Sequence, residues 1–188
     1  MKQARTLTDK QLKQVLAHCS TRKHAARDRA IVLFSFLAGL RAKEIAALTQ
    51  ANVLGEDGRV REEFTLSPLQ TKGRKARRVF LNERLQKELA IYLKQAKLRA
   101  ICPALFQSQK GAGFSPNTMC QLLLRIYDGA GFADATSHSG RRSMITALAA
   151  KGIGVRVLQT LAGHSSISTT QRYIDVNDEQ LRAAVELA

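Results

Sequence analysis

When the segment from Ala25 to Leu37 is drawn as a helix, apolar side chains lie on nearly all of its sides. Such a helix has no face suited to water and must be enclosed by other elements. The longest apolar run, Ala30 to Leu40, is interrupted by Ser35 and Gly39, and it is too short for a membrane-spanning helix, which needs about 20 apolar residues. The chain is therefore expected to fold around a central helix.

Start signals on both sides of that segment indicate further helices. Thr8 and Gln11 form a capping-box pattern, and Leu7 can pack on Leu12 as a hydrophobic staple. Asn82 is a typical helix cap, and Ser115-Pro116 places proline at a first helical position. The expected helices cover about residues 9–17, 25–37, 41–48, 82–98, 115–127, 140–151, 155–161, 168–174 and 177–187.

Residues from about Asn52 to Phe80 differ from these helical segments. Gly55 to Gly58 is a turn signal, and Arg59 to Leu66 and Ala76 to Leu81 alternate in polarity or are rich in β-branched and aromatic residues. We expect two or three short antiparallel strands here, the last two joined by the basic turn Thr71 to Lys75. The expected fold class is mainly α with a small antiparallel β-sheet (α+β).

The charge of the chain indicates a polyanionic partner. Its 188 residues, a length that fits one domain, include 30 Lys and Arg against 15 Asp and Glu, a net charge of +15. Such an excess favours nucleic acid first and an anionic membrane surface second. The first 13 residues are too polar for a secretory signal. Three widely spaced cysteines suit a reducing cytoplasm, and they form no zinc-ligand pattern with the four histidines.

Two arginines are candidates for binding a phosphate group. Guanidiniums bind phosphate oxygens through paired, charge-assisted hydrogen bonds. Arg41 follows Gly39 and begins a short helix, and Glu44 lies three residues further on, where it can orient that arginine. Arg141 is the second candidate. The alternative for Arg41 alone is an ordinary solvated arginine.

Tyr173 is the candidate nucleophile, since a phenolate that attacks phosphorus forms a phosphotyrosyl bond. The alternative is a half-buried tyrosine that packs its helix, which is how we interpret Tyr92 and Tyr127. His138 and His164 are candidate phosphate ligands and proton carriers, because imidazole titrates near neutrality. Each of them could instead be a capping or core histidine.

The order Arg41, Lys72, His138-x-x-Arg141, Gly163-His164 and Tyr173 resembles the tyrosine recombinase (phage integrase) family. The resemblance extends from about Thr8 to Tyr173. It implies a catalytic set of Arg41, Lys72, His138, Arg141, His164 and Tyr173, with Glu44 supporting Arg41.

The resemblance also assigns individual roles. Lys72 would protonate the leaving 5′-hydroxyl, His138 would assist deprotonation of Tyr173, and His164 would hydrogen-bond the phosphate. Cleavage would pass through a 3′-phosphotyrosyl intermediate, with no metal, ATP or other cofactor. Five further basic residues are expected to contact the DNA backbone without chemistry: Lys43, Arg74, Lys75, Arg77 and Arg142, with Arg78 beside them.

The second family box departs from its usual form. It commonly reads His-x-Leu-Arg-His, and here it reads His138-Ser139-Gly140-Arg141-Arg142. Gly140 replaces a packing leucine, and Arg142 replaces the second histidine. The spacing from His138 favours Arg141 over Arg142 as the catalytic arginine.

The resemblance also implies a domain organisation and partners. Residues 1–175 would form the catalytic domain and residues 176–188 a tail helix, which packs on its own domain or is exchanged with a neighbouring protomer. The N-terminal domain that closes such recombinases around DNA is not expected in this chain. The partners would be double-stranded DNA and further copies of the chain in a synaptic tetramer. We expect a cytoplasmic, nucleoid-associated protein of bacterial or phage origin, with no membrane partner.

Two other functions remain compatible with parts of the sequence. Residues Val155 to Tyr173 can be drawn as a helix-turn-helix, so a non-enzymatic DNA-binding protein would account for the charge. That interpretation leaves Arg41, Lys72 and the His138-x-x-Arg141 spacing unexplained. A type IB topoisomerase would share the phosphotyrosine chemistry, but the short chain and the spacing from Gly163-His164 to Tyr173 favour the recombinase.

Overall fold

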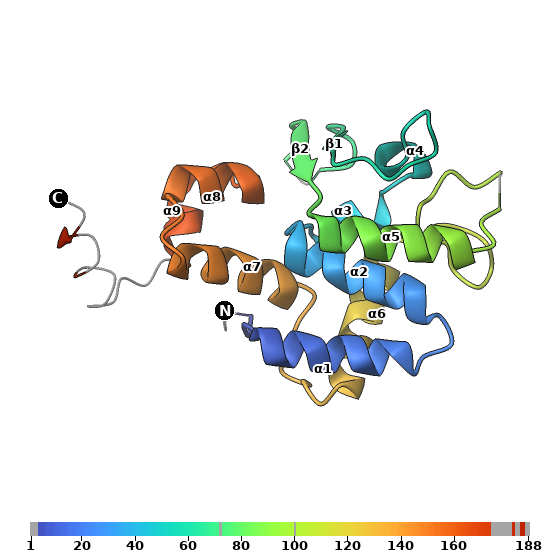
Figure 1. Ribbon diagram of the computed structural model, residues 1–188, viewed down its shortest axis with the longest axis horizontal. Helices are drawn as coiled ribbons and strands as arrows, with labels where there is room; N and C mark the ends of the chain where they lie inside the picture. Colours follow the sequence, from blue (N-terminus) through green and yellow to red (C-terminus); the bar gives the residue numbers. More distant parts are fainter. Residues whose placement is uncertain (1–3, 72, 100, 174–181, 183–184, 187–188) are drawn as a thin grey trace.

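The computed structural model describes residues 4–71, 73–99, 101–173, 182 and 185–186 (Figure 1). Helix α2 (Ala25–Leu37) lies in the middle of the molecule, where it packs against α1 (Asp9–Ser20), α5 (Glu83–Gln95) and α7 (Ser139–Ala150). Its residues from Ala30 to Phe34 are fully buried. The central helix predicted from its apolar sides is therefore confirmed.

The remaining helices extend this core in two directions. Helix α3 (Ala42–Ala46) packs against α6 (Pro116–Gly129), which also contacts α1. Beyond α7 lie α8 (Val155–Ala162) and α9 (Ile167–Gln171), on the left in Figure 1. The expected tail helix at 177–187 lies outside the described residues, apart from positions 182 and 185–186.

The small sheet consists of β1 (Glu63–Leu66) and β2 (Arg77–Phe80), paired antiparallel with Phe64 opposite Val79. Inward and outward side chains alternate on both strands, so Arg77 and Val79 point inward from β2. Short helix α4 (Gln50–Val53), which the sequence analysis did not predict, packs beside β1. The fold is mainly helical with a small antiparallel sheet, as predicted.

Side-chain caps start several of these helices where the sequence indicated. Thr8 and Gln11 form the capping box of α1, which continues to Ser20 rather than ending near Ala17. The side chain of Asn82 accepts a hydrogen bond from Leu85 N at the start of α5. That of Ser115 accepts one from Thr118 N at the start of α6.

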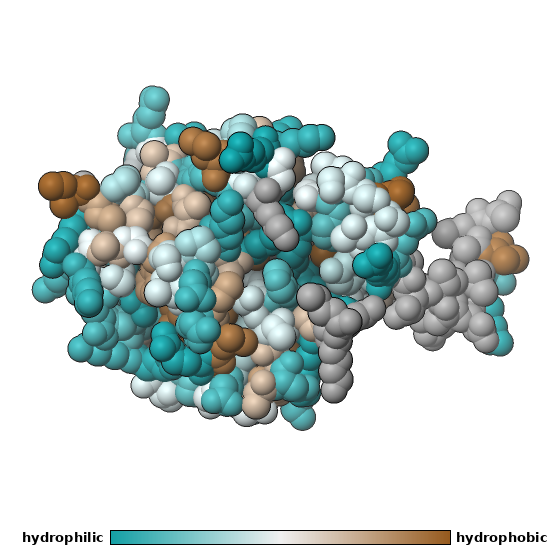
Figure 2. Space-filling view, turned by 180° about the vertical axis from the view of Figure 1, so that it is seen from behind, coloured by the Kyte–Doolittle hydropathy of each residue, from teal (hydrophilic) through white to brown (hydrophobic). Residues whose placement is uncertain are grey.

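The described surface is largely hydrophilic on the face shown in Figure 2, where hydrophobic side chains form isolated patches. Within the described residues, no helix combines the length and the apolar character needed to cross a membrane.

Helices α2 and α7 approach closely because Gly140 has no side chain. A Cβ atom at this position would lie 2.5 Å from Ser35 Oγ and 2.7 Å from a ring carbon of Phe36. Both neighbours are buried in α2. Gly140 therefore fixes the distance at which α7 carries Arg141 past the end of α2.

We expect Gly140→Ala to destabilise the protein, although alanine is the better helix former by about 1 kcal/mol. The added methyl group overpacks the contact with α2, which should lower the free energy of unfolding by about 1–3 kcal/mol. Chemical denaturation measures this change. Gly154→Ala is the control, because a Cβ atom there meets no other atom within 4 Å. A Gly140→Ala protein as stable as the wild type would contradict the packing argument.

Candidate active site

The connection between α2 and α3 turns sharply at Gly39, whose φ of +61° lies in the left-handed region. A side chain there would also meet Met144 of α7, since a Cβ atom would lie 2.8 Å from its Sδ. Glycine is thus required by both the backbone conformation and the close packing. The turn directs the carbonyls of Ala38 and Gly39 toward arginines and places Arg41 at the N-cap of α3.

Arg141 lies in the first turn of α7 and is buried. Its Nη1 donates to the Gly39 carbonyl at 2.6 Å, and its Nη2 donates to the carbonyl of Ala162 at the end of α8. One planar guanidinium therefore joins the α2–α3 turn to the α8–α9 turn. The arginine expected from its spacing to His138 is the one that reaches the interior.

Glu44 is fully buried and serves two arginines. Its Oε1 accepts from Arg41 Nη1 at 2.8 Å. Its Oε2 accepts from the Arg41 backbone N at 2.8 Å and from Arg77 Nη1 at 3.0 Å. The expected support of Arg41 by Glu44 is present, and Arg41 keeps part of its side chain exposed, at 21%.

Arg77 does not lie where the sequence analysis placed it. It was expected to contact the DNA backbone, but its side chain is only 7% exposed. Its guanidinium donates to Glu44 and, at 3.2 Å, to the carbonyl of Ala38. The physical reason is strand alternation, because Arg77 shares the inward face of β2 with the buried Val79.

Helix α8 ends at Ala162 and is capped by Gly163, which has a left-handed φ of +60°; the next residue is His164. The Nδ1 atom of His164 lies 2.9 Å from Thr170 Oγ1. Its ring stacks on the ring of Tyr173, with centroids 5.9 Å apart and planes 17° apart. The half-buried Tyr173 therefore lies beside His164, and the Cζ atom of Arg142 lies 5.2 Å from the Tyr173 ring centre.

The electrostatics of this cluster favour an anion. Arg41 and Arg77 share the carboxylate of Glu44, and the nearby guanidinium of Arg141 adds a third positive charge. Burial, followed by the charges of Arg41 and Arg77, lowers the pKa of Arg141 to about 9, which leaves it charged at neutral pH. A phosphate group bound here would compensate the excess positive charge.

The same surroundings lower the pKa of His164 to about 4, first through burial and then through Arg141, Arg41 and Arg77. We therefore expect its imidazole to be neutral at neutral pH. As the pH falls below about 6.5, His164 is protonated in the unfolded chain before it is protonated in the folded protein. The free energy of unfolding therefore decreases as the pH falls from about 6.5 toward about 4.

An NMR titration of the imidazole nitrogens tests this expectation, with His164→Gln assigning the resonance. The titration midpoint of His164 should lie well below the ordinary histidine pKa. Inorganic phosphate should raise this midpoint, because its negative charge compensates the positive charge of the arginines. A midpoint at or above about 6.5 would contradict the arrangement.

The other predicted site residues are exposed or lie outside the described residues. His138 is exposed and immediately precedes α7, with its carbonyl accepting from Arg142 N at 2.9 Å. Lys43, Arg74 and Lys75 are exposed, and their contacts with a DNA backbone stay a prediction. Lys72 lies outside the described residues.

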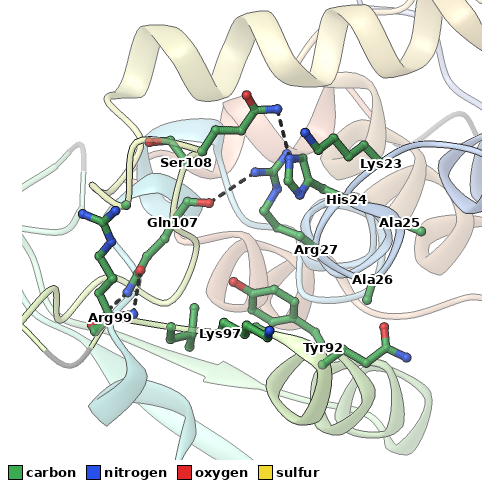
Figure 3. A pocket seen from close by; sticks show the side chains of 15 residues that line it. Lys23, His24, Ala25, Ala26, Arg27, Tyr92, Lys97, Arg99, Gln107 and Ser108 are labelled. Carbon is green, nitrogen blue, oxygen red and sulfur yellow. Dashed lines mark hydrogen bonds between the residues drawn. The ribbon is translucent and has the colours of Figure 1, made fainter.

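A separate pocket of about 530 Å³ lies at the other end of α2, where Ala25 and Ala26 form part of its wall (Figure 3). Its polar side chains contact one another. Arg27 Nη1 donates to the Gln107 carbonyl at 3.2 Å, and Gln109 Nε2 lies 3.1 Å from His24 Nε2. The pocket shares no residue with the arginine cluster.

Comparison with protein families gives one match that covers most of the chain. The sequence model of the phage integrase family matches residues 5–180. The tyrosine recombinase XerA of Pyrococcus furiosus is 32% identical over 187 residues, which are 98% of this chain and 62% of that protein. The tyrosine recombinase XerD of Neisseria meningitidis is 29% identical over 185 residues, which are 96% and 61% of the two chains. The chain thus spans about three-fifths of these relatives.

Solved structures show the same fold. The crystal structure of XerA recombinase superposes with a TM-score of 0.76 and 24% identity, over 99% of this chain and 66% of that one. The Tn1549 transposon integrase, solved in complex with a circular intermediate DNA, gives a TM-score of 0.78 and 20% identity, over 100% and 67% of the two chains.

Proposed function

This chain belongs to the phage integrase family, and from that premise we propose that it carries the catalytic residues of a site-specific DNA recombinase. One observation carries the proposal. Arg41 and Arg77 share the buried carboxylate of Glu44, Arg141 adds a third positive charge beside them, and the half-buried Tyr173 stacks its ring on a histidine. This arrangement combines an anion-binding cluster with an oxygen nucleophile, the two components that phosphodiester cleavage needs.

In the proposed reaction the Tyr173 oxygen attacks a DNA phosphorus. The new O–P bond forms as the bond from phosphorus to the 5′-oxygen breaks, which leaves a 3′-phosphotyrosyl link and a free 5′-hydroxyl. We assign His138 to accept the phenol proton and Lys72 to protonate the leaving oxygen. Because the phosphotyrosyl ester retains the energy of the broken bond, a 5′-hydroxyl from a partner duplex can rejoin the strand without ATP or a metal ion.

The arginines stabilise the charge that grows on the non-bridging oxygens. Within the described chain, Arg41 uses only Nη1 of its side chain to bind Glu44, so its Nε and Nη2 remain for a phosphate oxygen. Arg141 holds the α2–α3 and α8–α9 turns together and supplies a second positive charge. His164, which we expect to be neutral, would donate a hydrogen bond to the same phosphate.

We further propose the organisation that this reaction requires. Residues 1–175 would act as the catalytic domain on double-stranded DNA, and residues 176–188 would form a tail helix that docks on this domain or on a neighbouring protomer. Four copies would assemble on two duplexes and exchange strands through a four-way junction. The substrate places the reaction in the cytoplasm, at the nucleoid.

The structure offers less support for the helix-turn-helix alternative. Helix α9 has only five residues, which is short for a helix that reads several bases. The turn before it is bound to the arginine cluster, because Ala162 accepts from Arg141. The α8–α9 turn is thus part of the phosphate-binding site in our proposal.

Covalent capture on DNA tests the proposal. The protein is incubated with a library of random-sequence duplexes, each nicked at one fixed position within the random segment. When cleavage falls a few nucleotides to the 5′ side of the nick, the short 5′-hydroxyl fragment diffuses away and the strand cannot be rejoined. Protein–DNA complexes that survive denaturing electrophoresis are collected, and their DNA is sequenced. We expect a covalent protein–DNA band and a shared sequence among the captured duplexes.

Two results would contradict the proposal. Binding that is only non-covalent and weakens steeply with salt would identify a DNA-binding module. Relaxation of supercoiled plasmid without any preferred sequence would identify a topoisomerase.

A further inference from the structure

Arg77 is a buried cation whose bonds are not explained by stability alone. Its side chain is 7% exposed, and it shares Glu44 with Arg41 instead of having a carboxylate of its own. Its Nε has no hydrogen-bond partner within the described part of the chain. Burial and the nearby Arg41 lower its pKa, against the opposing effect of Glu44. Replacing a buried ion pair by apolar side chains of similar volume is often neutral or stabilising, so such a pair is weak evidence of a role in stability.

The first link made by Arg77 leads to Arg41. Arg77 Nη1 and the Arg41 backbone N both bind Oε2 of Glu44, while Oε1 binds Arg41 Nη1. Arg77 therefore fixes the rotation of the carboxylate that orients the Arg41 guanidinium. Without Arg77, the Glu44 carboxylate would be held only by its hydrogen bonds with Arg41.

The second link leads to Arg141 through the backbone. Arg77 Nη2 binds the carbonyl of Ala38, and Arg141 Nη1 binds the next carbonyl, that of Gly39. Two arginines from different elements thus hold consecutive peptide groups of the α2–α3 turn. A shift of this turn would move the partner of Arg141 and the start of α3 together.

The third link leads to the turn that carries His164. A Cβ atom on Gly163 would lie 2.6 Å from Arg77 Cδ, so the left-handed glycine at the end of α8 lies directly against the arginine stem. Arg77 itself begins β2, five residues after Lys72 in the chain. One side chain therefore contacts the supports of Arg41, Arg141 and His164.

We propose that Arg77 is a positioning residue for the cleavage reaction, which aligns Arg41 and Arg141 around one phosphate through Glu44 and the Ala38–Gly39 turn. It does not touch the phosphate itself. The inference rests on the recombinase function proposed above. It adds a specific expectation, namely that loss of Arg77 impairs the cleavage rate of bound DNA rather than DNA binding.

The test compares Arg77→Met with the wild type on a nicked duplex selected by covalent capture. Methionine keeps much of the apolar stem and removes the charge and both hydrogen bonds. We expect single-turnover cleavage of saturating DNA to slow by about a hundredfold, as misplaced catalytic groups do. The dissociation constant for the same duplex should change by less than about threefold, because the buried guanidinium contacts no DNA.

Two further variants separate positioning from general structural support. Arg77→Lys retains the charge but cannot span the Glu44 oxygen and the Ala38 carbonyl with one planar group, so its rate should lie between those of wild type and Arg77→Met. Glu44→Gln combined with Arg77→Met should cleave little more slowly than the slower single variant, because both act through one network. Arg84→Met, at an exposed position next to the start of α5, is the matched control and should cleave like the wild type.

Several results would overturn the inference. One is an Arg77→Met protein that cleaves at the wild-type rate, and another is a variant that loses DNA affinity but not cleavage rate. A third is a double variant whose losses of cleavage rate are additive. The last is a loss of cleavage rate that follows the unfolded fraction of the variant and is recovered by cooling. A wild-type protein that forms no covalent complex with any duplex would instead refute the proposed function, so the two failures are distinguishable.

Discussion

Tyr173→Phe is expected to abolish covalent capture of DNA completely while leaving DNA binding unchanged. The substitution removes only the hydroxyl oxygen. The phenyl ring can still stack on His164 and lie beneath the guanidinium of Arg142, which are the ring contacts that the structure shows. Denaturing electrophoresis measures the covalent product, and a gel-shift titration measures affinity. No other group in the proposal can form the phosphotyrosyl bond.

The two buried tyrosines provide the controls for this variant. Tyr92 donates its hydroxyl to the Leu105 carbonyl at 2.8 Å, and burial raises its pKa to about 12. Tyr127 is fully buried, and burial raises its pKa as well. Tyr92→Phe and Tyr127→Phe should therefore still yield the covalent product. A covalent band from Tyr173→Phe would show that another residue is the nucleophile.

Arg141→Ala is expected to give the second largest effect, a loss of cleavage on the order of a hundredfold to a thousandfold. The variant removes a positive charge from the phosphate site and leaves the carbonyls of Gly39 and Ala162 without their donor. Most of the DNA affinity should remain, because the many exposed basic residues supply it. Single-turnover cleavage and equilibrium binding on the same duplex measure the two effects separately.

Arg141→Lys shows whether charge alone is sufficient. A lysine ammonium is a point charge that does not reproduce the planar bridge between two carbonyls, so we expect most of the loss to persist. Arg125→Ala, at an exposed position of α6, is the control and should cleave normally. If affinity and cleavage fall by the same factor in Arg141→Ala, Arg141 is only a DNA contact.

The helical framework could be predicted from the sequence because its signals are local. Side-chain caps at Thr8, Asn82 and Ser115 start their helices as expected, and the apolar α2 is central. Helix α4 (Gln50–Val53) was missed because its four residues are too few to show a periodic pattern. Its capping box, from Thr49 to Asn52, was the available signal.

The candidate site was predictable in its residue types but only partly in its contacts. The pairing of Arg41 with Glu44 follows from their helical spacing, and the structure shows it. The burial of Arg77 was missed because the whole basic run, from Arg74 to Arg78, was interpreted as contacting DNA phosphates. Its position two residues before Val79 on a strand was the signal that it shares the inward face. The Arg142–Tyr173 contact joins segments far apart in the chain, which no local pattern reveals.

The most direct test of the proposed mechanism is to identify the atom to which DNA becomes attached. The captured complex is digested with nuclease and protease, and the nucleotide-bearing peptide is sequenced by mass spectrometry. We predict a 3′-phosphonucleotide on the oxygen of Tyr173 and a free 5′-hydroxyl on the released fragment. An adduct on any other residue, or a 5′-phosphate linked to the protein, would contradict the mechanism.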